Sequence, residues 1–344
     1  MHIELAERFR TFAAHECASS SPLYEALCLR IATDDDVLAV AARAAGGQPV
    51  PNLLLAAVQL LLTREPGHAL ASFYPSISGH PASPADAYPA FRSFVLANRD
   101  GIEAVLGQRR VQTNEVRRCA YLLPAIAHAA SLFAARPLAL VEIGTSAGLN
   151  LLWDQYKYLY DGGASIGPPG SPVIVRSSFR GPVRPTLATS MPAVSHRIGL
   201  DLNVIDATDA AQVDWLRALI WPEHHERRAM LDAAILVLRD ADLDLRTGDG
   251  FAMLPGVVDA IPRASLPCVY HTHVANQISS EARQAFARSV DAIGRTRDLV
   301  HVHNNIEPHL HLTAYRDGAR IDVPLARTDG HARWIEWLAR DATG

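Results

Sequence analysis

Cysteine and long apolar runs are scarce in this sequence. It has four cysteines in 344 residues, and none stands in a C-x-x-C pair. A chain of this size with so few cysteines is not a disulfide scaffold, which indicates a reducing compartment. The longest apolar run, residues 53–62, contains Gln59 and falls short of the about 20 residues that cross a bilayer. The charged N-terminus lacks the apolar core of a signal peptide. We therefore expect a cytoplasmic protein.

An excess of charge of one sign is also absent. The formal net charge is −4, which gives no general attraction to nucleic acid or to anionic membranes. Hydrophobic residues make up 49% of the chain and charged residues 20%, which is enough apolar material for a sizeable core. We expect a globular protein that acts on a small-molecule substrate, with no nucleic acid and no membrane as partner. No pattern in the sequence indicates an oligomeric state.

The chain divides into two parts with different patterns. In residues 1–135, apolar side chains recur at three- and four-residue spacing, as in amphipathic helices. From residue 136 onward, short apolar runs alternate with helical patterns, as in parallel α/β sheets. We predict an N-terminal helical or lid domain, residues 1–135, and an α/β domain, residues 136–344. A proline-rich, irregular insertion interrupts the second domain at about 164–195.

The second part has the strand pattern of a mostly parallel sheet that carries helices on both faces. Its last two strands are joined at Asp317-Gly318, a turn typical of a hairpin. The predicted strands are residues 138–143, 196–200, 243–246, 268–273, 299–303, 309–316 and 319–325. The predicted helices are residues 149–160, 211–239 with an interruption at 221–222, 279–293 and 331–340.

A glycine-punctuated turn follows the first predicted strand, in the sequence Glu142-Ile-Gly144-Thr-Ser146-Ala-Gly148-Leu-Asn150. Gly144 allows a sharp turn, and Gly148 allows the next helix to lie close to the strand or to a ligand. Free N–H groups at a helix start favour a carboxylate or phosphate. Glu142 could accept hydrogen bonds from a ligand ammonium or hydroxyl group. Ser146 stands where dinucleotide binders usually have a second glycine. An ordinary strand–turn–helix junction is the alternative.

Two further acidic residues follow later strands. Asp201 ends the second predicted strand and Asp249 ends the third. Ligands of open α/β sheets bind beyond the carboxyl ends of the strands, where Asp201 could hold ribose hydroxyls and Asp249 could reach the adenine edge. Asp201 follows Gly144 by 57 residues, against about 20 in a dinucleotide fingerprint, which disfavours NAD. Turn chemistry at strand ends accounts equally well for each acid taken alone.

Three H-x-H pairs occur late in the sequence, at His271/His273, His301/His303 and His309/His311. Side chains at i and i+2 of a strand share a face, so with a carboxylate such as Glu307 these pairs could bind zinc. Spacing alone does not bring the pairs together, and we assign no metal. The pair that ends the fourth strand could instead supply a general base, His271 or His273, with Asn276 as a hydrogen-bond donor to the substrate.

Polar residues also gather at a predicted helix start in the first part, at Asn114, Glu115 and Arg118. Capping and a surface ion pair are the simpler interpretation. If this helix start lies over the ligand edge of the sheet, the same three residues would contact the substrate.

These motifs resemble two groups of known proteins. The glycine turn with Asp201 and Asp249 is similar to the cofactor site of Rossmann-type S-adenosylmethionine-dependent methyltransferases. More closely, the whole chain resembles a bacterial family of unknown function, domain-of-unknown-function family 2332. The shared segments, within about residues 110–250, are Thr113-Asn114-Glu115-x-x-Arg118, Glu142 to Asn150 with Asp154-x-Tyr156-x-Tyr158, Gly199-Leu-Asp201-Leu-Asn203 and Trp215-Leu-Arg217-Ala-Leu-x-Trp221-Pro222-Glu223.

The resemblance implies a Rossmann-like, methyltransferase-type α/β sheet and S-adenosylmethionine as the cofactor. The cofactor-binding residues implied are Glu142, Gly144, Ser146, Gly148, Asn150, Asp201 and Asp249. We expect an S-adenosylmethionine-dependent methyltransferase that acts on an unidentified small molecule, with catalytic residues among His271, His273 and Asn276. The alternatives are a metal-dependent hydrolase that uses the H-x-H pairs and a non-enzymatic nucleotide- or cofactor-binding protein.

Overall fold

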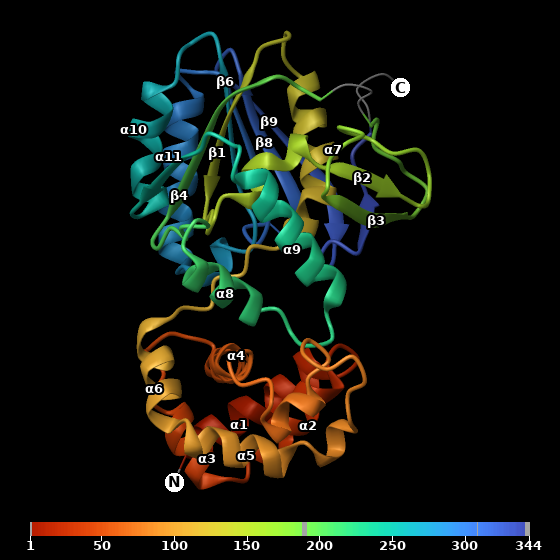
Figure 1. Ribbon diagram of the computed structural model, residues 1–344. Helices are drawn as coiled ribbons and strands as arrows, with labels where there is room; N and C mark the ends of the chain where they lie inside the picture. The colour runs from red at the N-terminus through yellow and green to blue at the C-terminus, as the bar shows by residue number, and fades with distance from the viewer. Residues whose placement is uncertain (1, 188–190, 308, 341–344) are drawn as a thin grey trace. The chain divides into compact units, whose positions relative to one another are not determined.

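The chain folds into two compact units, shown in Figure 1. The structure is a computed structural model that describes residues 2–187, 191–307 and 309–340. No helix in these ranges is long and apolar enough to cross a membrane.

The first unit, called the helical unit here, holds residues 2–113 and 209–229. The second, called the sheet unit, holds residues 114–208 and the described residues from 230 onward. The structure therefore divides near residue 113 and not at the expected boundary of 135. The reason is that the helix after residue 118 packs on the strands of the sheet unit.

Helices make up the regular structure described in the helical unit. They are α1 (Ile3–Phe12), the π-helical turn η1 (Ala13–Cys17), α2 (Pro22–Ile31), α3 (Asp35–Ala41), α4 (Val50–Leu62), the 3-10 turns η2 (Ala69–Phe73) and η3 (Pro84–Asp86), α5 (Tyr88–Ala97), α6 (Arg99–Gln108) and α8 (Ala210–Ala218). α9 (His225–Leu238) begins in this unit and continues into the sheet unit. The predicted interruption at residues 221–222 separates α8 from α9.

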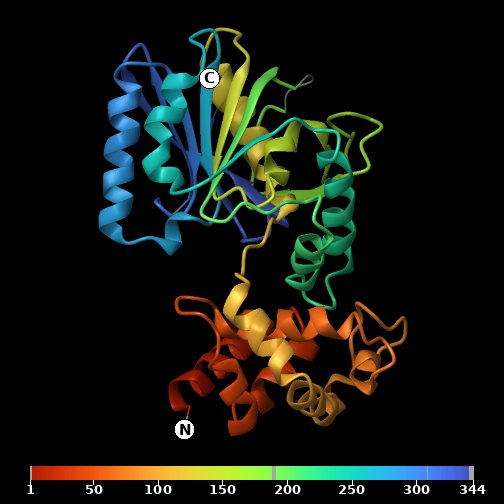
Figure 2. The same ribbon diagram turned by 60° about the vertical axis from the view of Figure 1, so that its left-hand side comes forward.

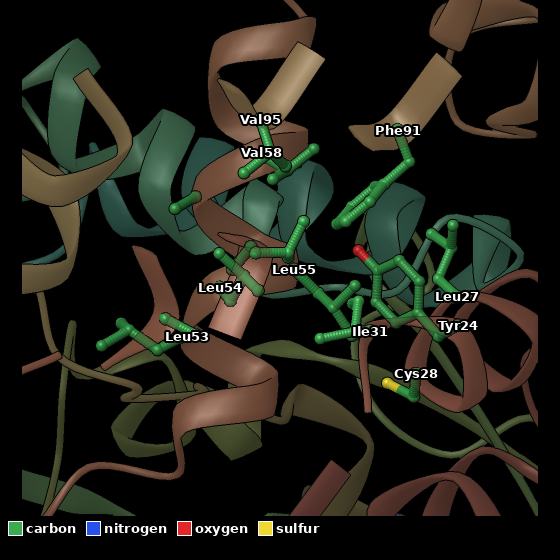
Figure 3. Packing of buried hydrophobic residues seen from close by; sticks show 14 of the residues in the cluster. Tyr24, Leu27, Cys28, Ile31, Leu53, Leu54, Leu55, Val58, Phe91 and Val95 are labelled. Carbon is green, nitrogen blue, oxygen red and sulfur yellow. The ribbon is translucent and has the colours of Figure 1, made fainter. Parts of the chain in front are cut away.

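Helix α4 is the centre of the helical unit because it is apolar on almost every side. Its one buried polar side chain, Gln59, donates hydrogen bonds to the carbonyl oxygens of Ala218 (2.9 Å) and Ile220 (2.7 Å). These bonds satisfy the buried amide of Gln59 and hold residues 209–229 of the helical unit to α4. Figure 3 shows side chains of α4 packed with those of α2 and α5, among them Leu55, Val58, Tyr24, Ile31 and Phe91.

The sheet unit is built on one ten-stranded, mostly parallel sheet, as the α/β prediction requires. The strands are β1 (Leu138–Ile143), β2 (Lys157–Tyr160), β3 (Ile174–Arg180), β4 (Val194–Asp201), β5 (Asp244–Thr247), β6 (Leu266–His271), β7 (Leu299–His303), β8 (Leu310–Arg316), β9 (Ala319–Thr328) and β10 (Trp334–Trp337). Their order is β2-β3-β10-β9-β8-β7-β6-β1-β4-β5. The parallel strands β5-β4-β1-β6-β7 reverse their order between β1 and β6, which is the switch point of this sheet.

Helices cover both faces of the sheet. Helices α10 (Gly250–Ala260) and α11 (Ser280–Gly294) lie side by side on one face, as Figure 2 shows. Helix α7 (Cys119–Ser131) contacts β7, β8 and β9. On β1, Ala139 and Val141 belong to the core beneath α10 and α11, and every residue of the strand is buried. A strand covered on both faces reads as a continuous apolar run, which is why this strand was easy to predict.

Two predicted elements are wrong, and one helix was not predicted. The expected helix after β1 is only a short 3-10 helix, η5 (Leu149–Gln155), and the chain then enters strand β2. The expected last helix, 331–340, contains strand β10 instead. Helix α10 was not predicted, because Gly250 and Pro255 resemble loop residues. In β2, Tyr158 and Tyr160 are buried while their neighbours are half-exposed, which is the two-residue alternation of a strand.

Candidate functional site

The loops at the carboxyl ends of the parallel strands contain most of the predicted site residues. These loops follow β1, β4, β5 and β6, and the loop after β9 lies at the same edge because β9 runs parallel to β7. In open α/β sheets this edge is where ligands bind.

Glu142 is buried inside the sheet unit, with 1% of its surface exposed. Its Oε2 accepts a hydrogen bond of 2.8 Å from the Thr145 hydroxyl. Burial raises the pKa of Glu142 to about 8, although hydrogen bonds from Thr145 and Asn150 favour the charged form. Glu142 is therefore mostly protonated at neutral pH, and its buried carboxyl group is hydrogen-bonded to Thr145 of the β1 turn.

The backbone of the β1 turn is held by Asp201 at the end of β4. Its Oδ2 accepts from the Ser146 amide (2.8 Å) and its Oδ1 from the Asn203 amide (2.9 Å). These bonds keep Ser146 in a left-handed conformation, with φ at +54°. Gly144 also has a positive φ, +76°, and a Cβ there would lie 2.3 Å from Cγ2 of Val274. The glycine therefore lets the loop after β6 close against the turn.

The amides predicted to face a ligand already have a partner in Asn114. Its Oδ1 accepts from the amides of Ala147 (3.2 Å) and Leu149 (3.3 Å). Asn150 is also engaged, because its Oδ1 lies 3.3 Å from the Cys119 thiol that donates to it. Asn114, one of the predicted substrate residues, therefore accepts hydrogen bonds from the backbone of the β1 turn.

Asp249 lies at the same edge, after β5, and is exposed. Its Oδ1 accepts from the amides of Phe251 (3.0 Å) and Ala252 (3.3 Å) and so caps α10. Its position agrees with the prediction, while its bonds are those of an N-terminal helix cap.

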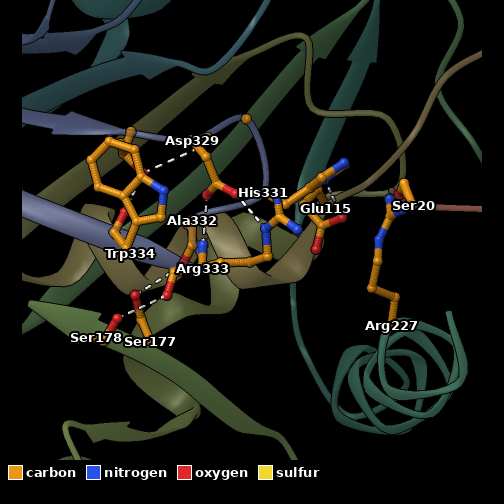
Figure 4. A network of polar contacts seen from close by, with 12 residues as sticks. Ser20, Glu115, Ser177, Ser178, Arg227, Asp329, His331, Ala332, Arg333 and Trp334 are labelled. Carbon is orange, nitrogen blue, oxygen red and sulfur yellow. Dashed lines mark hydrogen bonds and ion pairs between the residues drawn. The ribbon is translucent and has the colours of Figure 1, made fainter. Parts of the chain in front are cut away.

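Arg118, a predicted substrate residue, is hydrogen-bonded to the loop after β6. Its guanidinium donates to the Thr272 hydroxyl (3.4 Å) and to the carbonyl oxygen of Gly330 (3.3 Å). Beside it, Nδ1 of His331 lies 3.2 Å from Oε2 of the buried Glu115 (Figure 4). Sequence reasoning missed His331 entirely, because its partner lies 216 residues away in the chain.

The predicted catalytic residues have different positions. His271 has no exposed surface and packs edge-on against Phe251 and Phe286, so it does not face a substrate. His273 is half-exposed at the edge, and desolvation, with Arg118 nearby, lowers its pKa to about 4. Asn276 is exposed on the short turn η6 (Ala275–Gln277).

A cluster of imidazoles lies under α10 and α11. The ring centres of His301 and His303 are 4.3 Å apart, and those of His271 and His301 are 5.2 Å apart. Within the part of the chain that the structure describes, both nitrogens of His271 and one nitrogen each of His301 and His303 lack a hydrogen-bond partner. Although the H-x-H pairs do meet, no three His, Cys, Asp or Glu side chains in the described ranges are placed to hold a metal ion.

A family model described as "Uncharacterized protein conserved in bacteria (DUF2332)" matches residues 6–337. The chain belongs to this family. No curated protein matches it, and no solved structure does. The family description includes no activity, so any reaction of this DUF2332 protein has to be inferred from the residues at its sheet edge.

The β1 turn of this DUF2332 protein also fits a second pattern. Gly144-Thr-Ser146-Ala-Gly148 reads as G-x-S-x-G, the spacing of a nucleophile elbow, and the left-handed Ser146 suits such a turn. The Ser146 hydroxyl, however, is buried, and among the described residues it has no hydrogen-bond partner that could act as its base. We therefore assign it no nucleophilic role.

Two cavities lie beside η5, and Gln155 lines both. One of about 370 Å³ includes Met191 and Val194 in its lining, and one of about 560 Å³ includes Arg197 and Leu236. Neither lining contains a predicted site residue. The candidate site is thus an edge of polar loops, distinct from these two cavities.

Proposed function

We propose that this DUF2332 protein binds S-adenosylmethionine at the carboxyl edge of its sheet and transfers the methyl group to a small molecule. The observation that carries the proposal is the placement of Asp201 and Asp249 after the adjacent parallel strands β4 and β5. The parallel strands have the relative order 3-2-1-4-5 of a Rossmann-type sheet, whose ligands lie at this edge.

The surroundings of Asp201 suit an adenosine group. Its carboxylate, 8% exposed, is fixed at the mouth of the β1 turn by the bond from the Ser146 amide. Leu202, the next residue, is a large apolar side chain with 70% of its surface exposed. A carboxylate next to an apolar surface is the combination that a ribose and its base require, since hydroxyls need acceptors and the ring needs an apolar face.

The residues fit the two halves of the cofactor unequally. The acids after β4 and β5 suit the adenosine half. The β1 turn does not suit the amino-acid half in this conformation, because Asn114 takes the amides of Ala147 and Leu149 and Val274 lies against Gly144. We assign no contact to that half, and the proposal rests on Asp201 and Asp249.

Isothermal titration calorimetry with S-adenosylmethionine and S-adenosylhomocysteine tests the proposal. We expect binding to the wild-type protein and an affinity loss of about tenfold or more in Asp201→Asn, which keeps the side-chain volume but removes the charge. The matched control is Asp259→Ala, an exposed acid elsewhere on α10, which should bind as the wild type does. No heat of binding at millimolar ligand would overturn the proposal, and an unchanged affinity in Asp201→Asn would remove the ribose assignment.

A further inference from the structure

A buried carboxylate and a partly exposed imidazole form a pair at the edge of the sheet. The side chain of Glu115 is 4% exposed and that of His331 is 42% exposed. Their contact, Oε2 to Nδ1, is 3.2 Å long (Figure 4). Glu115 is fixed from below, because its Oε1 accepts from the Arg117 amide at the start of η4 (Val116–Arg118).

This contact bears on which nitrogen of the imidazole ring carries the proton. An ionised carboxylate only accepts hydrogen bonds, so beside an ionised Glu115 the Nδ1 atom of a neutral imidazole carries the proton and donates it. The other nitrogen, Nε2, is then left with a lone pair. In the described ranges, no side chain or backbone group is hydrogen-bonded to Nε2 of His331. A base oriented by a carboxylate behind it is the arrangement that general-base catalysis uses.

The loop that carries His331 reaches the switch point. Gly330 accepts a hydrogen bond from Arg118, and a Cβ on Gly330 would lie 3.8 Å from Cε1 of His273. Arg118 also bonds to Thr272, in the loop after β6. His331 is therefore next to the loop whose Val274 closes on the β1 turn. It lies at the edge where the proposed function places the reaction.

The other histidines of this region are less suitable as bases. His271 is fully buried, and its pKa is lowered to about 3 by desolvation. The pKa of His273 is lowered to about 4, first by desolvation and then by Arg118. A base works best when its pKa is near the working pH, so both rings are poor proton acceptors at neutral pH. His331 is the one of the three that is partly exposed and has a carboxylate partner.

We infer that His331, oriented by Glu115, is the general base of this site and that the methyl acceptor is a protic nucleophile, a hydroxyl or an amine. The inference rests on the proposed function for the identity of the reaction. The acceptor gives its O–H or N–H proton to Nε2 of His331. Its electron pair forms the bond to the methyl carbon, and the pair of the broken C–S bond stays on the sulfur of the sulfonium donor. Glu115 is the positioning residue, because it acts on the acceptor only through the imidazole that it orients.

The test is a measurement on His331 that needs no substrate. Nitrogen-15 NMR of histidine-labelled protein reports the tautomer of each ring, and diethyl pyrocarbonate followed by peptide mass spectrometry reports the reactivity of each neutral nitrogen. We expect the Nδ1–H tautomer at His331 and rapid modification of that residue. In Glu115→Gln, which keeps an acceptor for the Arg117 amide, we expect mixed tautomers and an about three- to tenfold slower modification. Exposed His196 is the internal control and should react equally in both proteins.

Two outcomes would overturn the inference: an Nε2–H tautomer in the wild type, or a His331 reactivity that does not change in Glu115→Gln. The wild-type spectrum decides the first even if the variant does not fold. Calorimetry separates this inference from the proposed function. His331→Asn should bind S-adenosylmethionine as the wild type does, while its methyl transfer to an acceptor should fall by about 10²- to 10⁴-fold. If the wild type binds no S-adenosylmethionine, the proposed function fails, and the NMR result still tests the acid–base pair.

Discussion

Mild acid should destabilise the sheet unit through three buried histidines. His271, His301 and His303 are at most 4% exposed, and desolvation is the first cause that lowers the pKa of each. The pKa falls to about 3 for His271 and to about 2 for His303, from an ordinary value of 6.5. The charged groups that face them are His311 on β8 and Arg320 and Asp322 on β9. The ring of His271 also contacts Phe251 of α10 and Phe286 of α11.

The direction follows from where protons bind. Above about pH 6.5 these histidines are neutral in both states, and their contribution to stability is complete. As the pH falls below that value, only the unfolded chain takes up protons, so stability is lost until the folded pKa is reached. Each histidine then costs about 2 kcal/mol at pH 5, and three cost about 6 kcal/mol.

Glu142 acts in the opposite direction. Its pKa is raised to about 8 in the folded protein from an ordinary value of 4.5, so the folded state holds a proton that the unfolded chain loses. As the pH falls from 7 to 5, this adds about 2 to 3 kcal/mol of stability. The net expected loss from these four groups is about 3 to 4 kcal/mol, a large share of the 5–15 kcal/mol typical of a folded domain.

Urea denaturation at pH 7 and pH 5 measures this loss, and two variants separate its causes. His271→Phe places an apolar ring beside Phe251 and Phe286 and should reduce the loss by about 2 kcal/mol. Glu142→Gln should increase the loss by about 2 to 3 kcal/mol. Exposed His196→Gln is the control and should leave it unchanged. If His271→Phe loses as much stability as the wild type, His271 is not neutral and buried, and the reasoning fails.

Three further predictions concern the packing of the sheet unit. Gly144→Ala should destabilise the protein by about 1 to 3 kcal/mol in urea denaturation, because it strains a positive φ and meets Val274; adding Val274→Ala should restore part of that loss. Asn114→Ala leaves two amides of the β1 turn without their acceptor, and hydrogen exchange of those amides should accelerate, with a stability loss of about 1 to 3 kcal/mol. Asp154→Ala should lower the free energy of unfolding by about 3 to 5 kcal/mol, because it leaves the mostly buried Arg197 without its two bonds to that carboxylate, of 2.7 and 2.8 Å. Equal melting curves for Asp154→Ala and the wild type would show that this ion pair carries no net stability.

Continuous apolar strands were the elements that the sequence predicted best. β1 and β7 have the predicted bounds, because a strand covered on both faces contains only apolar or buried residues. α11 was predictable from its cap, since the Ser279 hydroxyl accepts from the Ala282 amide. The segment around β2 was misread because its aromatic residues fit a helical face and a strand alternation equally well. The choice between the two was made by pairing with β3, which a single sequence does not contain.

Positions at the carboxyl edge of the sheet were predictable only where they follow from the place of a strand. Asp201 was found because it ends a strand, and the sheet order then places it beside the β1 turn. The partner of Glu115 could not be found in this way. His331 stands in a short loop between β9 and β10, and no spacing rule joins it to a residue on η4. Their contact exists because residues 114–131 belong to the sheet unit, whereas the predicted boundary placed them in the helical part.

The closed state of the β1 turn changes what its glycines mean. Where a glycine turn binds a ligand, the amides after it are left for that ligand. Here the Ser146 amide donates to Asp201, and the amides of Ala147 and Leu149 donate to Asn114. The side chain of Val274 packs where a side chain at Gly144 would lie. The turn is thus satisfied by its own chain, and its glycines serve close packing. Polar groups with spare capacity lie further along the edge, at Nε2 of His331, so chemistry at this edge should depend more on the loops after β6 and β9 than on the glycine motif itself.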